Sequence, residues 1–363
     1  MSNTKLNSAL EALKKSGMRV YTNEDVPTQE YIKTGSLILD KLLGGGVSTR
    51  RIHQFFGKPG CYKSVMSYHV INNALTQYPE SVAILLDLEC RYDPRWVGKF
   101  VTPENMERLI VLREEFVEDA GNSINKIITQ LKGTHISIIV IDSIAAANTA
   151  RYDNGDMRKM EVAGAAMGIG KLVRALVQIA DKNNTAVLVL NQLRDDLNAF
   201  GPSIGRTSGG YQLKHSLETN TYFRLLGQTD TKSLAGTNFE VKSDLGETEQ
   251  IAAGVGFKIM KGANWSCSGK TLFYRKATEN NDFGFDIFNE VVSIALANNV
   301  IRVEGASFIH PLFPLNEKKG INAITDKKPM IAFLKDNPDV FEKIKNEVEN
   351  YVEITEEGTV EDC

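Results

Sequence analysis

The amino-acid sequence predicts an α/β fold with a mostly parallel central sheet flanked by helices. Near-continuous apolar runs, typical of strands buried on both faces, alternate with helix-like segments along the chain. Three of these runs end in polar side chains; they are Ala83–Leu86, Ile136–Ile141 and Ala186–Leu190. A glycine-bearing loop also lies between an apolar run and a helix-like segment, which is the context of a phosphate-binding loop. We therefore expect a P-loop core, with a short N-terminal helix and a small C-terminal α/β lobe.

The composition excludes several classes of protein. With 42% hydrophobic and 24% charged residues over 363 positions, the chain is typical of globular proteins and can bury a large core. Its net charge of −3 gives no overall basic field, so a nucleic-acid site has to be a local patch. The cysteines are scattered without a C-x-x-C pair, which fits a reducing compartment better than a disulfide framework or a zinc site.

Residues 1–30 predict a short amphipathic helix and a linker. Leu6, Leu10 and Leu13 recur at helical spacing, with charged residues opposite them. A helix of this length is not stable by itself, so it must dock either on its own domain or on a neighbouring copy of the chain; periodicity leaves both open. The segment is polar, and no apolar run approaches membrane-spanning length, so we expect no signal peptide and no membrane partner. Further on, Thr34–Gly46 predicts a capped short helix closed by glycines.

The next stretch is the predicted phosphate-binding loop. An apolar run, Ile52–Phe56, precedes it and a helix-like segment, Val65–Thr76, follows it. Backbone N–H groups of such a loop and the positive end of the helix together hold a polyphosphate. Lys63 supplies a charge to the β- and γ-phosphates, and Ser64 supplies a hydroxyl ligand to Mg²⁺. The expected nucleotide-binding residues are Gly57, Lys58, Pro59, Gly60, Cys61, Tyr62, Lys63, Ser64 and Val65.

Tyr62 departs from the usual pattern, because it occupies the position of the second glycine of the loop. Gly60 and Pro59 still permit a tight turn, but Tyr62 has to tolerate the backbone conformation that the loop imposes. An ordinary turn before a helix is the alternative interpretation of this stretch taken alone.

The polar residues at the three strand ends predict the chemistry of the site. Carboxyl ends of parallel strands meet at one edge of the sheet, where open α/β folds bind ligands. Asp142 is expected to hold Mg²⁺, Glu89 to orient and deprotonate the attacking water, and Gln192 to contact the γ-phosphate. A single acid at a strand end is more often a helix cap or a partner for a lysine. The agreement of three strand ends with one loop favours the nucleotide site.

With these residues identified, the sequence resembles the RecA family of homologous recombinases over most of its length. An aromatic residue in place of the second loop glycine, followed by Lys-Ser, is similar to phage UvsX-type recombinases. The matching segments are Thr34–Leu37 with Leu39-Asp40, the phosphate loop, Asp87–Glu89, Asp93-Pro94, Ile141–Ser143, Asn191–Arg194, Ser208–Gly210 and Phe333–Pro338.

The resemblance implies further roles around the nucleotide. Asp93 and Trp96 stand where family members contact and stack on adenine, although a large aromatic residue is also a common core filler. Lys261 and Lys214 match residues that approach a neighbour's ATP site, whereas Ala263 replaces the family's second lysine. His215 replaces an aromatic residue.

The resemblance also implies DNA-binding loops at residues 151–162 and 194–210. Asp195 and Asp196 inside the second loop oppose DNA, and surface loops with a few basic residues are otherwise simply solvated. The expected DNA-binding residues are Met157, Arg158, Lys159, Val162, Arg174, Arg194, Phe200, Arg206, Gly209 and Gly210.

Together, the motifs and the resemblance imply a DNA-dependent ATPase that forms a helical filament on single-stranded DNA and catalyses homologous pairing and strand exchange. ATP and Mg²⁺ are the expected cofactors. Single- and double-stranded DNA, further copies of the chain, and mediator and single-strand-binding proteins are the expected partners. We expect the protein in the bacterial cytoplasm, with a phage origin. A hexameric RecA-core helicase and a nucleotide-binding mediator without turnover are the alternatives.

The remaining chain predicts a polar excursion, edge strands and a C-terminal lobe. The excursion is Leu226–Gln250, and Val255–Met260 and Thr271–Tyr274 alternate as strands do at the far edge of a sheet. Phe285–Val303 and Lys327–Tyr351 predict helices. We expect residues 1–30 to serve oligomerisation, 31–275 to form the ATPase core, 276–352 the lobe, and 353–363 an acidic tail that is either disordered or autoinhibitory.

Overall fold

The computed structural model describes residues 3–18, 20–22, 26–114, 116–147, 162–194, 205–236, 239–242, 246–264, 266–278 and 282–350. The chain forms two compact units, Met1–Glu30 and Tyr31–Cys363. The first unit contains α1 (Asn3–Lys15), so the predicted N-terminal helix is confirmed. Its last turn holds Lys14 and Lys15, whose charges favour the negative end of the helix dipole.

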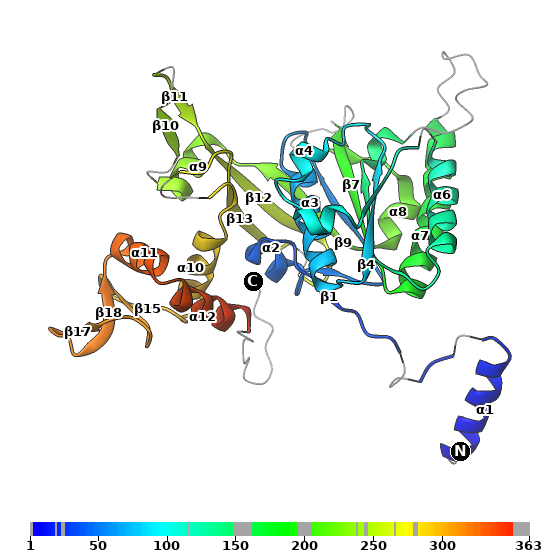
Figure 1. Ribbon diagram of the computed structural model, residues 1–363, viewed down its shortest axis with the longest axis horizontal. Helices are drawn as coiled ribbons and strands as arrows, with labels where there is room; N and C mark the ends of the chain where they lie inside the picture. Colours follow the sequence, from blue (N-terminus) through cyan, green and yellow to red (C-terminus); the bar gives the residue numbers. More distant parts are fainter. Residues whose placement is uncertain are drawn as a thin grey trace. The chain divides into compact units, whose positions relative to one another are not determined.

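A ten-stranded sheet organises the second unit, in the order β14-β13-β12-β9-β3-β7-β6-β4-β5 with β8 beside β7 (Figure 1). Along the path from β9 to β5 successive strands are parallel, whereas β12, β13 and β14 at the far edge, and β8 beside β7, pair antiparallel. The predicted mostly parallel sheet is therefore confirmed. Its strands are β3 (Ile52–Gly57), β4 (Ser81–Asp87), β5 (Leu109–Leu112), β6 (His135–Asp142), β7 (Ala186–Arg194), β8 (Arg206–Thr207), β9 (Leu217–Leu225), β12 (Ala252–Lys261), β13 (Ser268–Tyr274) and β14 (Gly284–Phe285).

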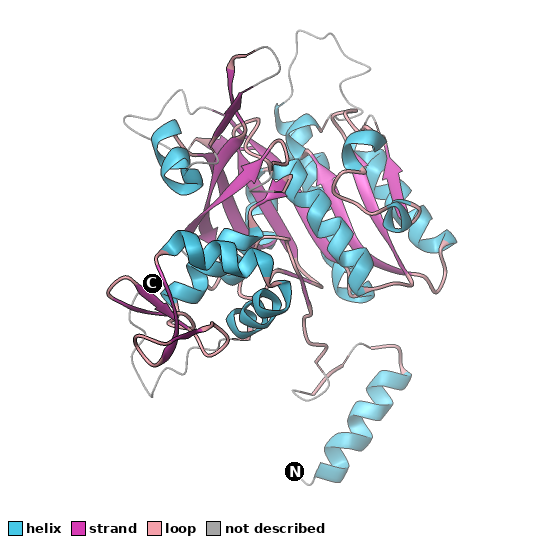
Figure 2. Ribbon diagram, turned by 60° about the vertical axis from the view of Figure 1, so that its left-hand side comes forward, coloured by secondary structure: helices cyan, strands magenta, loops and turns pink. Residues whose placement is uncertain are grey.

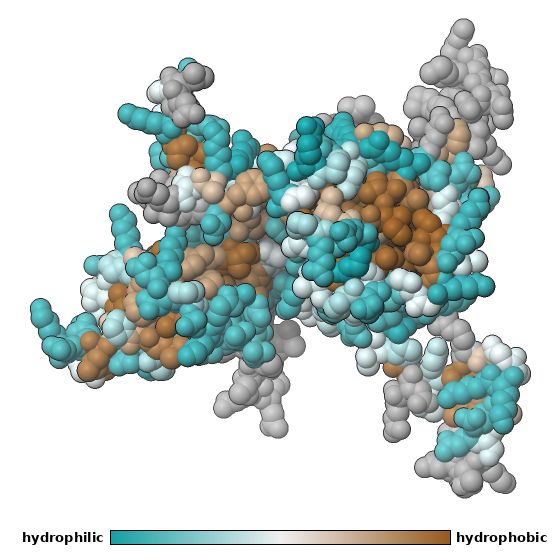
Figure 3. Space-filling view, in the orientation of Figure 1, coloured by the Kyte–Doolittle hydropathy of each residue, from teal (hydrophilic) through white to brown (hydrophobic). Residues whose placement is uncertain are grey.

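Helices cover both faces of this sheet, which explains the continuous apolar runs of its strands. Along β4, Ala83 and Leu85 join the core beneath α3, whereas Ile84 and Leu86 join the core beneath α6 and α7. The covering helices are α3 (Lys63–Gln77), α6 (Val117–Gln130), α7 (Val162–Asn183) and α8 (Gly210–Ser216). At the β5 edge the strand is only partly buried, and Figure 3 shows hydrophobic residues gathered on the surface between α3 and α6.

Short elements complete the core. Ser36 caps α2 by accepting a hydrogen bond from the Leu39 N–H, as the predicted capped helix requires. Between β9 and β12, the polar excursion contains a helix and an antiparallel hairpin of β10 and β11. These elements are β1 (Tyr31–Ile32), α2 (Leu37–Leu42), β2 (Val47–Ser48), α4 (Pro94–Val97), α5 (Pro103–Met106), the 3₁₀ turn η1 (Ile144–Ala146), α9 (Gln228–Ala235), β10 (Glu240–Lys242) and β11 (Thr248–Gln250).

The predicted C-terminal lobe is an α/β unit with a small sheet in the order β15-β16-β18-β17 (Figure 2). Its elements are α10 (Ile287–Ala297), β15 (Arg302–Glu304), β16 (Ser307–Ile309), β17 (Leu315–Asn316), β18 (Ile321–Thr325), α11 (Lys327–Asp336) and α12 (Pro338–Glu349). No helix of the described residues is long and apolar enough to cross a membrane.

Both helices predicted for the lobe are too long. The helix predicted over Phe285–Val303 ends at Ala297, after which Asn299 takes a left-handed conformation with φ 56°. The helix predicted over Lys327–Tyr351 is two helices, because Pro338 has no N–H to continue the first one and disfavours a helical conformation before it.

Candidate active site

The phosphate loop connects β3 to α3, as the sequence predicts. Two glycines are required by its geometry. A Cβ atom at Gly57 would lie 2.1 Å from the Phe223 carbonyl oxygen, and Gly60 has a φ of 78°. The loop therefore has the close backbone approach and the tight turn that phosphate loops need.

Lys63 is held by its own loop. Its buried ammonium donates hydrogen bonds to the carbonyl oxygens of Gly57 (3.0 Å) and Lys58 (2.9 Å), and lies 3.5 Å from the Cys61 sulfur. Burial raises the pKa of the Cys61 thiol, although the nearby Lys63 charge acts in the opposite direction. Cys61 is therefore a protonated packing residue rather than a reactive thiolate.

Tyr62 adopts the left-handed backbone conformation of a glycine, with φ 64° and ψ 20°. Its ring packs on Phe273 of β13 with the ring centroids 4.3 Å apart. Its hydroxyl accepts a hydrogen bond from Arg275 Nε at 3.0 Å. These contacts direct the Tyr62 side chain toward β13. An aromatic residue can therefore replace the usual glycine here, because its ring does not line the nucleotide-site pocket.

The two predicted metal ligands lie together. The Ser64 hydroxyl, in the first turn of α3, donates to the carboxylate of Asp142 at the end of β6. Burial raises the pKa of Asp142 to about 6, and the negative charges of Glu89 and Asp87 act in the same direction. A carboxylate and a hydroxyl are hard oxygen ligands that suit Mg²⁺. The described residues contain no cluster of three or more His, Cys, Asp or Glu side chains that could hold a metal.

Glu89 and Gln192 are also brought together. The Glu89 carboxylate accepts hydrogen bonds from Gln192 Nε2 at 2.6 Å and from the Ser143 hydroxyl at 2.5 Å. Arg91 Nη1 lies 3.5 Å from the other Glu89 oxygen. No role was predicted for Ser143 or Arg91, although Ser143 follows directly after Asp142 and Arg91 lies two positions after Glu89.

Asp87 folds the loop that carries these groups. Its buried carboxylate accepts hydrogen bonds from the backbone N–H groups of Arg91 (3.1 Å) and Tyr92 (2.9 Å). It also pairs with Arg113 Nε at 3.1 Å. The sequence reasoning treated Asp87 only as part of a motif, whereas it fixes the turn that follows β4.

These residues surround a pocket of about 210 Å³. Trp96 is 40% exposed, so it does not fill the core, and the Lys99 ammonium lies 4.9 Å from its ring centroid. Asp93 caps α4 and pairs with Arg95 at 3.3 Å; hydrogen bonds from Arg95 lower the pKa of Asp93. The pocket lining consists of Ser64, Tyr68, Leu85, Asp87, Glu89, Arg91, Tyr92, Trp96 and Asp142.

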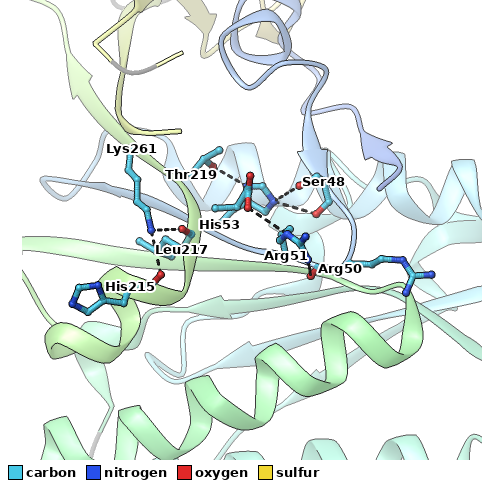
Figure 4. A network of polar contacts seen from close by, with 9 residues as sticks. Ser48, Arg50, Arg51, His53, His215, Leu217, Thr219 and Lys261 are labelled. Atoms are coloured by element: carbon cyan, nitrogen blue, oxygen red, sulfur yellow. Dashed lines mark hydrogen bonds and ion pairs between the residues drawn. The ribbon is translucent and has the colours of Figure 1, made fainter. Parts of the chain in front are cut away.

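Lys261 lies at a different place, beside the end of α8 (Figure 4), and Lys214 belongs to the last turn of that helix. The Lys261 ammonium donates to the carbonyl oxygens of Lys214 (3.1 Å), His215 (3.2 Å) and Leu217 (2.5 Å). It therefore caps the C-terminal end of α8. Neither lysine lines the pocket of its own chain.

The same view contains a buried histidine that is not part of the chemistry. His53 contacts the hydroxyl groups of Thr219 (2.7 Å) and Ser48 (3.0 Å), and burial lowers its pKa to about 4. His53 is therefore neutral, and it joins β2, β3 and β9.

The predicted DNA-binding residues are placed only in part. Met157, Arg158, Lys159 and Phe200 lie outside the described residues. Val162 begins α7, and the ends of the second loop meet where Arg194 of β7 pairs in register with Arg206 of β8. Gly209 (φ 106°) and Gly210 (φ 66°) open α8. Arg174 is exposed and lies twelve residues after Val162 in α7, about 18 Å along the helix axis from the end of the first loop.

Comparison with known proteins finds relatives that match most of the chain. The family model described as the RecA N-terminal domain matches residues 5–248. The chain is 26% identical over 359 residues to Protein RecA of Mesoplasma florum, with 97% of each chain covered. It is 27% identical over 310 residues to Protein RecA of Chlorobaculum tepidum, covering 84% of this chain and 82% of that protein. It is 25% identical over 325 residues to Protein RecA of Rickettsia bellii, covering 89% and 83%.

Proposed function

The chain belongs to the RecA family, and on this basis we propose a role for each of its site residues in ATP-dependent strand exchange. It is a recombinase: a DNA-dependent ATPase that pairs homologous DNA and exchanges strands. The observation that supports the residue assignments is the convergence of Ser64, Asp142 and Glu89 on one pocket beside the phosphate loop.

ATP binds with its phosphates on the loop from Gly57 to Ser64. The backbone N–H groups at the start of α3 and the Lys63 ammonium hold the β- and γ-phosphates, for which Lys63 exchanges its carbonyl partners for phosphate oxygens. Ser64 and Asp142 would hold Mg²⁺, which would supply positive charge to the phosphate oxygens. Trp96 offers a flat apolar surface to adenine, and Asp93 lies near it for a polar contact.

Hydrolysis uses Glu89 as the general base. Its carboxylate is oriented by Ser143 and Gln192, so one oxygen can face a water molecule positioned against the γ-phosphate. Gln192 also contacts the γ-phosphate, and this contact reports the nucleotide state to the second DNA-binding loop, which begins at the end of β7.

Assembly joins the two activities. Lys261 and Lys214 reach the ATP site of an adjoining copy, and residues 1–30 hold neighbouring copies together. Such a heterologous contact produces a helical filament when its rotation does not close. ATP and single-stranded DNA then tighten each other's binding, since coupling between sites is reciprocal. Double-stranded DNA is the second substrate. Mediator and single-strand-binding proteins are the further partners that we propose. We place the protein in the cytoplasm of a bacterial cell, with a phage as the source of its gene.

The test is the rate of ATP hydrolysis with and without single-stranded DNA over a range of protein concentrations. We expect the specific activity to rise with both. Glu89→Gln should abolish turnover and leave nucleotide binding intact, whereas a mediator without turnover would be indifferent to this change. A rate that ignores DNA and protein concentration would contradict the filament, and closed rings in electron micrographs with ATP and DNA would indicate a helicase instead.

A further inference from the structure

Arg91 lies in the wall of the nucleotide pocket and has no part in the proposed function. It lines the pocket together with the carboxylates of Asp87, Glu89 and Asp142, and it is the only lysine or arginine among the described lining residues. Its guanidinium Nη1 lies 3.5 Å from Glu89 Oε2. Its backbone N–H is fixed by Asp87, so the base of the side chain is held at the pocket wall.

The contact between Arg91 and Glu89 is not explained by stability. The Arg91 side chain is 82% exposed, and exposed ion pairs contribute little to folding. Glu89 is already oriented by two shorter hydrogen bonds, from Ser143 and Gln192. Arg91 is therefore held at one end by the backbone, while its guanidinium can exchange partners without disturbing the packing.

A triphosphate entering this pocket changes the balance of charge. The pocket has three carboxylates and one guanidinium in its lining, while the Lys63 ammonium is engaged by its own loop. A guanidinium is planar and presents paired N–H donors that match two phosphate oxygens, so a phosphate is a better partner than one carboxylate oxygen at 3.5 Å.

We propose that Arg91 is a further catalytic residue, which leaves Glu89 when ATP binds and contacts the terminal phosphate within the same chain. Water oxygen then bonds to the γ-phosphorus while the bond from that phosphorus to the β–γ bridging oxygen breaks. The electron pair leaves with ADP, Glu89 takes the proton of the water, and Arg91 stabilises the charge on the phosphoryl oxygens. The inference rests on the proposed function, because it needs Glu89 to be the base.

The experiment compares Arg91→Ala and Arg91→Lys with a control, Arg302→Ala. Arg302 is exposed on β15 of the C-terminal lobe and does not line the pocket. For Arg91→Ala we expect kcat of the DNA-stimulated ATPase to fall about 100-fold or more, with KM for ATP changed less than about fivefold, because the contact strengthens in the transition state. Arg91→Lys should recover part of kcat, and Arg302→Ala should stay within about twofold of the parent protein, since surface changes away from the site have small effects.

Two further measurements separate a catalytic role from a structural one. The parent protein should be trapped by ADP with aluminium fluoride, which mimics the transferring phosphoryl group, and Arg91→Ala should not be, while both bind ADP equally. A kcat within threefold of the parent for Arg91→Ala, or a loss confined to KM, overturns the proposal.

If Arg91→Ala does not fold, Arg91→Lys decides through the same kcat and trapping measurements. Glu89→Gln in the same assay distinguishes the two failures: an inactive Glu89→Gln beside a fully active Arg91→Ala removes only the role of Arg91, whereas an active Glu89→Gln removes the proposed function itself.

Discussion

Tyr62 shows how one residue depends on contacts from a distant part of the chain. A non-glycine residue in the left-handed region costs about 1 kcal/mol, and here the ring contact with Phe273 and the hydrogen bond from Arg275 offset that strain. Both partners come from the end of β13, more than two hundred positions later in the chain. The sequence therefore reveals that the loop departs from its usual pattern, but it cannot reveal how the departure is accommodated.

The hydrogen bond from Arg275 to Tyr62 gives a prediction for nucleotide affinity. Arg275→Ala and Tyr62→Phe each remove this bond, and each should weaken ADP binding about two- to fivefold, because one hydrogen bond of this kind is worth about 0.5–1 kcal/mol. The double variant should be no weaker than either single variant, since both changes remove the same interaction. Fluorescent ADP titrations measure the effect. Lys276→Ala is the control, because Lys276 pairs with Glu249 instead of the loop; an additive double variant would contradict the prediction.

The positions of the other site residues also depend either on local sequence or on distant parts of the chain, and only the first kind could be predicted. Lys63, Glu89 and Asp142 could be placed from the sequence, because the ends of parallel strands meet at one edge of the sheet. The position of Arg91 could not be predicted, because it depends on the turn that Asp87 fixes. Asp87 is held in turn by Arg113, which lies 26 positions after it in the chain. For the residues in the two DNA-binding loops, the sequence assignments stay predictions.

At the scale of elements, Lys261 links β12 to α8, the helix that follows the predicted second DNA-binding loop. Its three carbonyl partners lie at the end of α8, where backbone acceptors have no partner within the helix. We expect Lys261→Met to destabilise this end by about 1 kcal/mol and to speed amide exchange at residues 214–217 by several-fold. Hydrogen-exchange mass spectrometry measures this change. Lys258→Met on the same strand is the control, and unchanged exchange in Lys261→Met would show that the cap is not needed.

One element boundary is visible in the sequence because a residue forces it, although the helix predicted over Lys327–Tyr351 runs through it. Pro338 divides the last helical stretch, and proline at that position is visible in the sequence. The end of α10 at Ala297 was not predictable, because the apolar residues continue to Val300 and Ile301, where they enter the core of the lobe without helical structure. Hydrophobic spacing identifies burial, but the partner element decides whether a buried residue is in a helix.

At the scale of the whole molecule, the buried Glu290 connects the lobe to the core, and a second buried acid, Asp40, lies near it in the core. Glu290 of α10 accepts hydrogen bonds from Ser36, from the Ile38 N–H and from Thr271 of β13. Asp40 of α2 accepts from the N–H and hydroxyl of Thr34. Burial raises the pKa of both carboxyls to about 7; Lys33 opposes the shift at Asp40, while Glu349 adds to it there and Asp40 adds to it at Glu290.

These shifts give a pH dependence of stability. A folded-state pKa above the unfolded value means that the folded protein binds more protons between about pH 4.5 and 7. The free energy of unfolding therefore decreases as pH rises through this window. Glu290→Gln cannot ionise, so its stability should fall less between pH 5 and pH 8 than that of the parent protein. Urea unfolding at the two pH values measures the difference, and the exposed Glu304→Gln is the control. An equal fall in the parent and in Glu290→Gln would contradict the assignment.

We propose that the N-terminal unit determines how copies of the molecule assemble. Residues 1–30 form a compact unit separate from residues 31–363, and α1 is too short to be stable by itself. If α1 docks on a neighbouring copy, a chain that starts at Tyr31 should keep its melting temperature and its affinity for ADP. Its ATPase, however, should no longer rise with protein concentration, and its filaments on single-stranded DNA should be lost.

If α1 docks on its own core, the melting temperature should fall instead, because apolar surface would be uncovered. Thermal unfolding and sedimentation with ATP and DNA distinguish these outcomes, and Leu10→Ala in the full chain tests the apolar face of α1 without removing the segment.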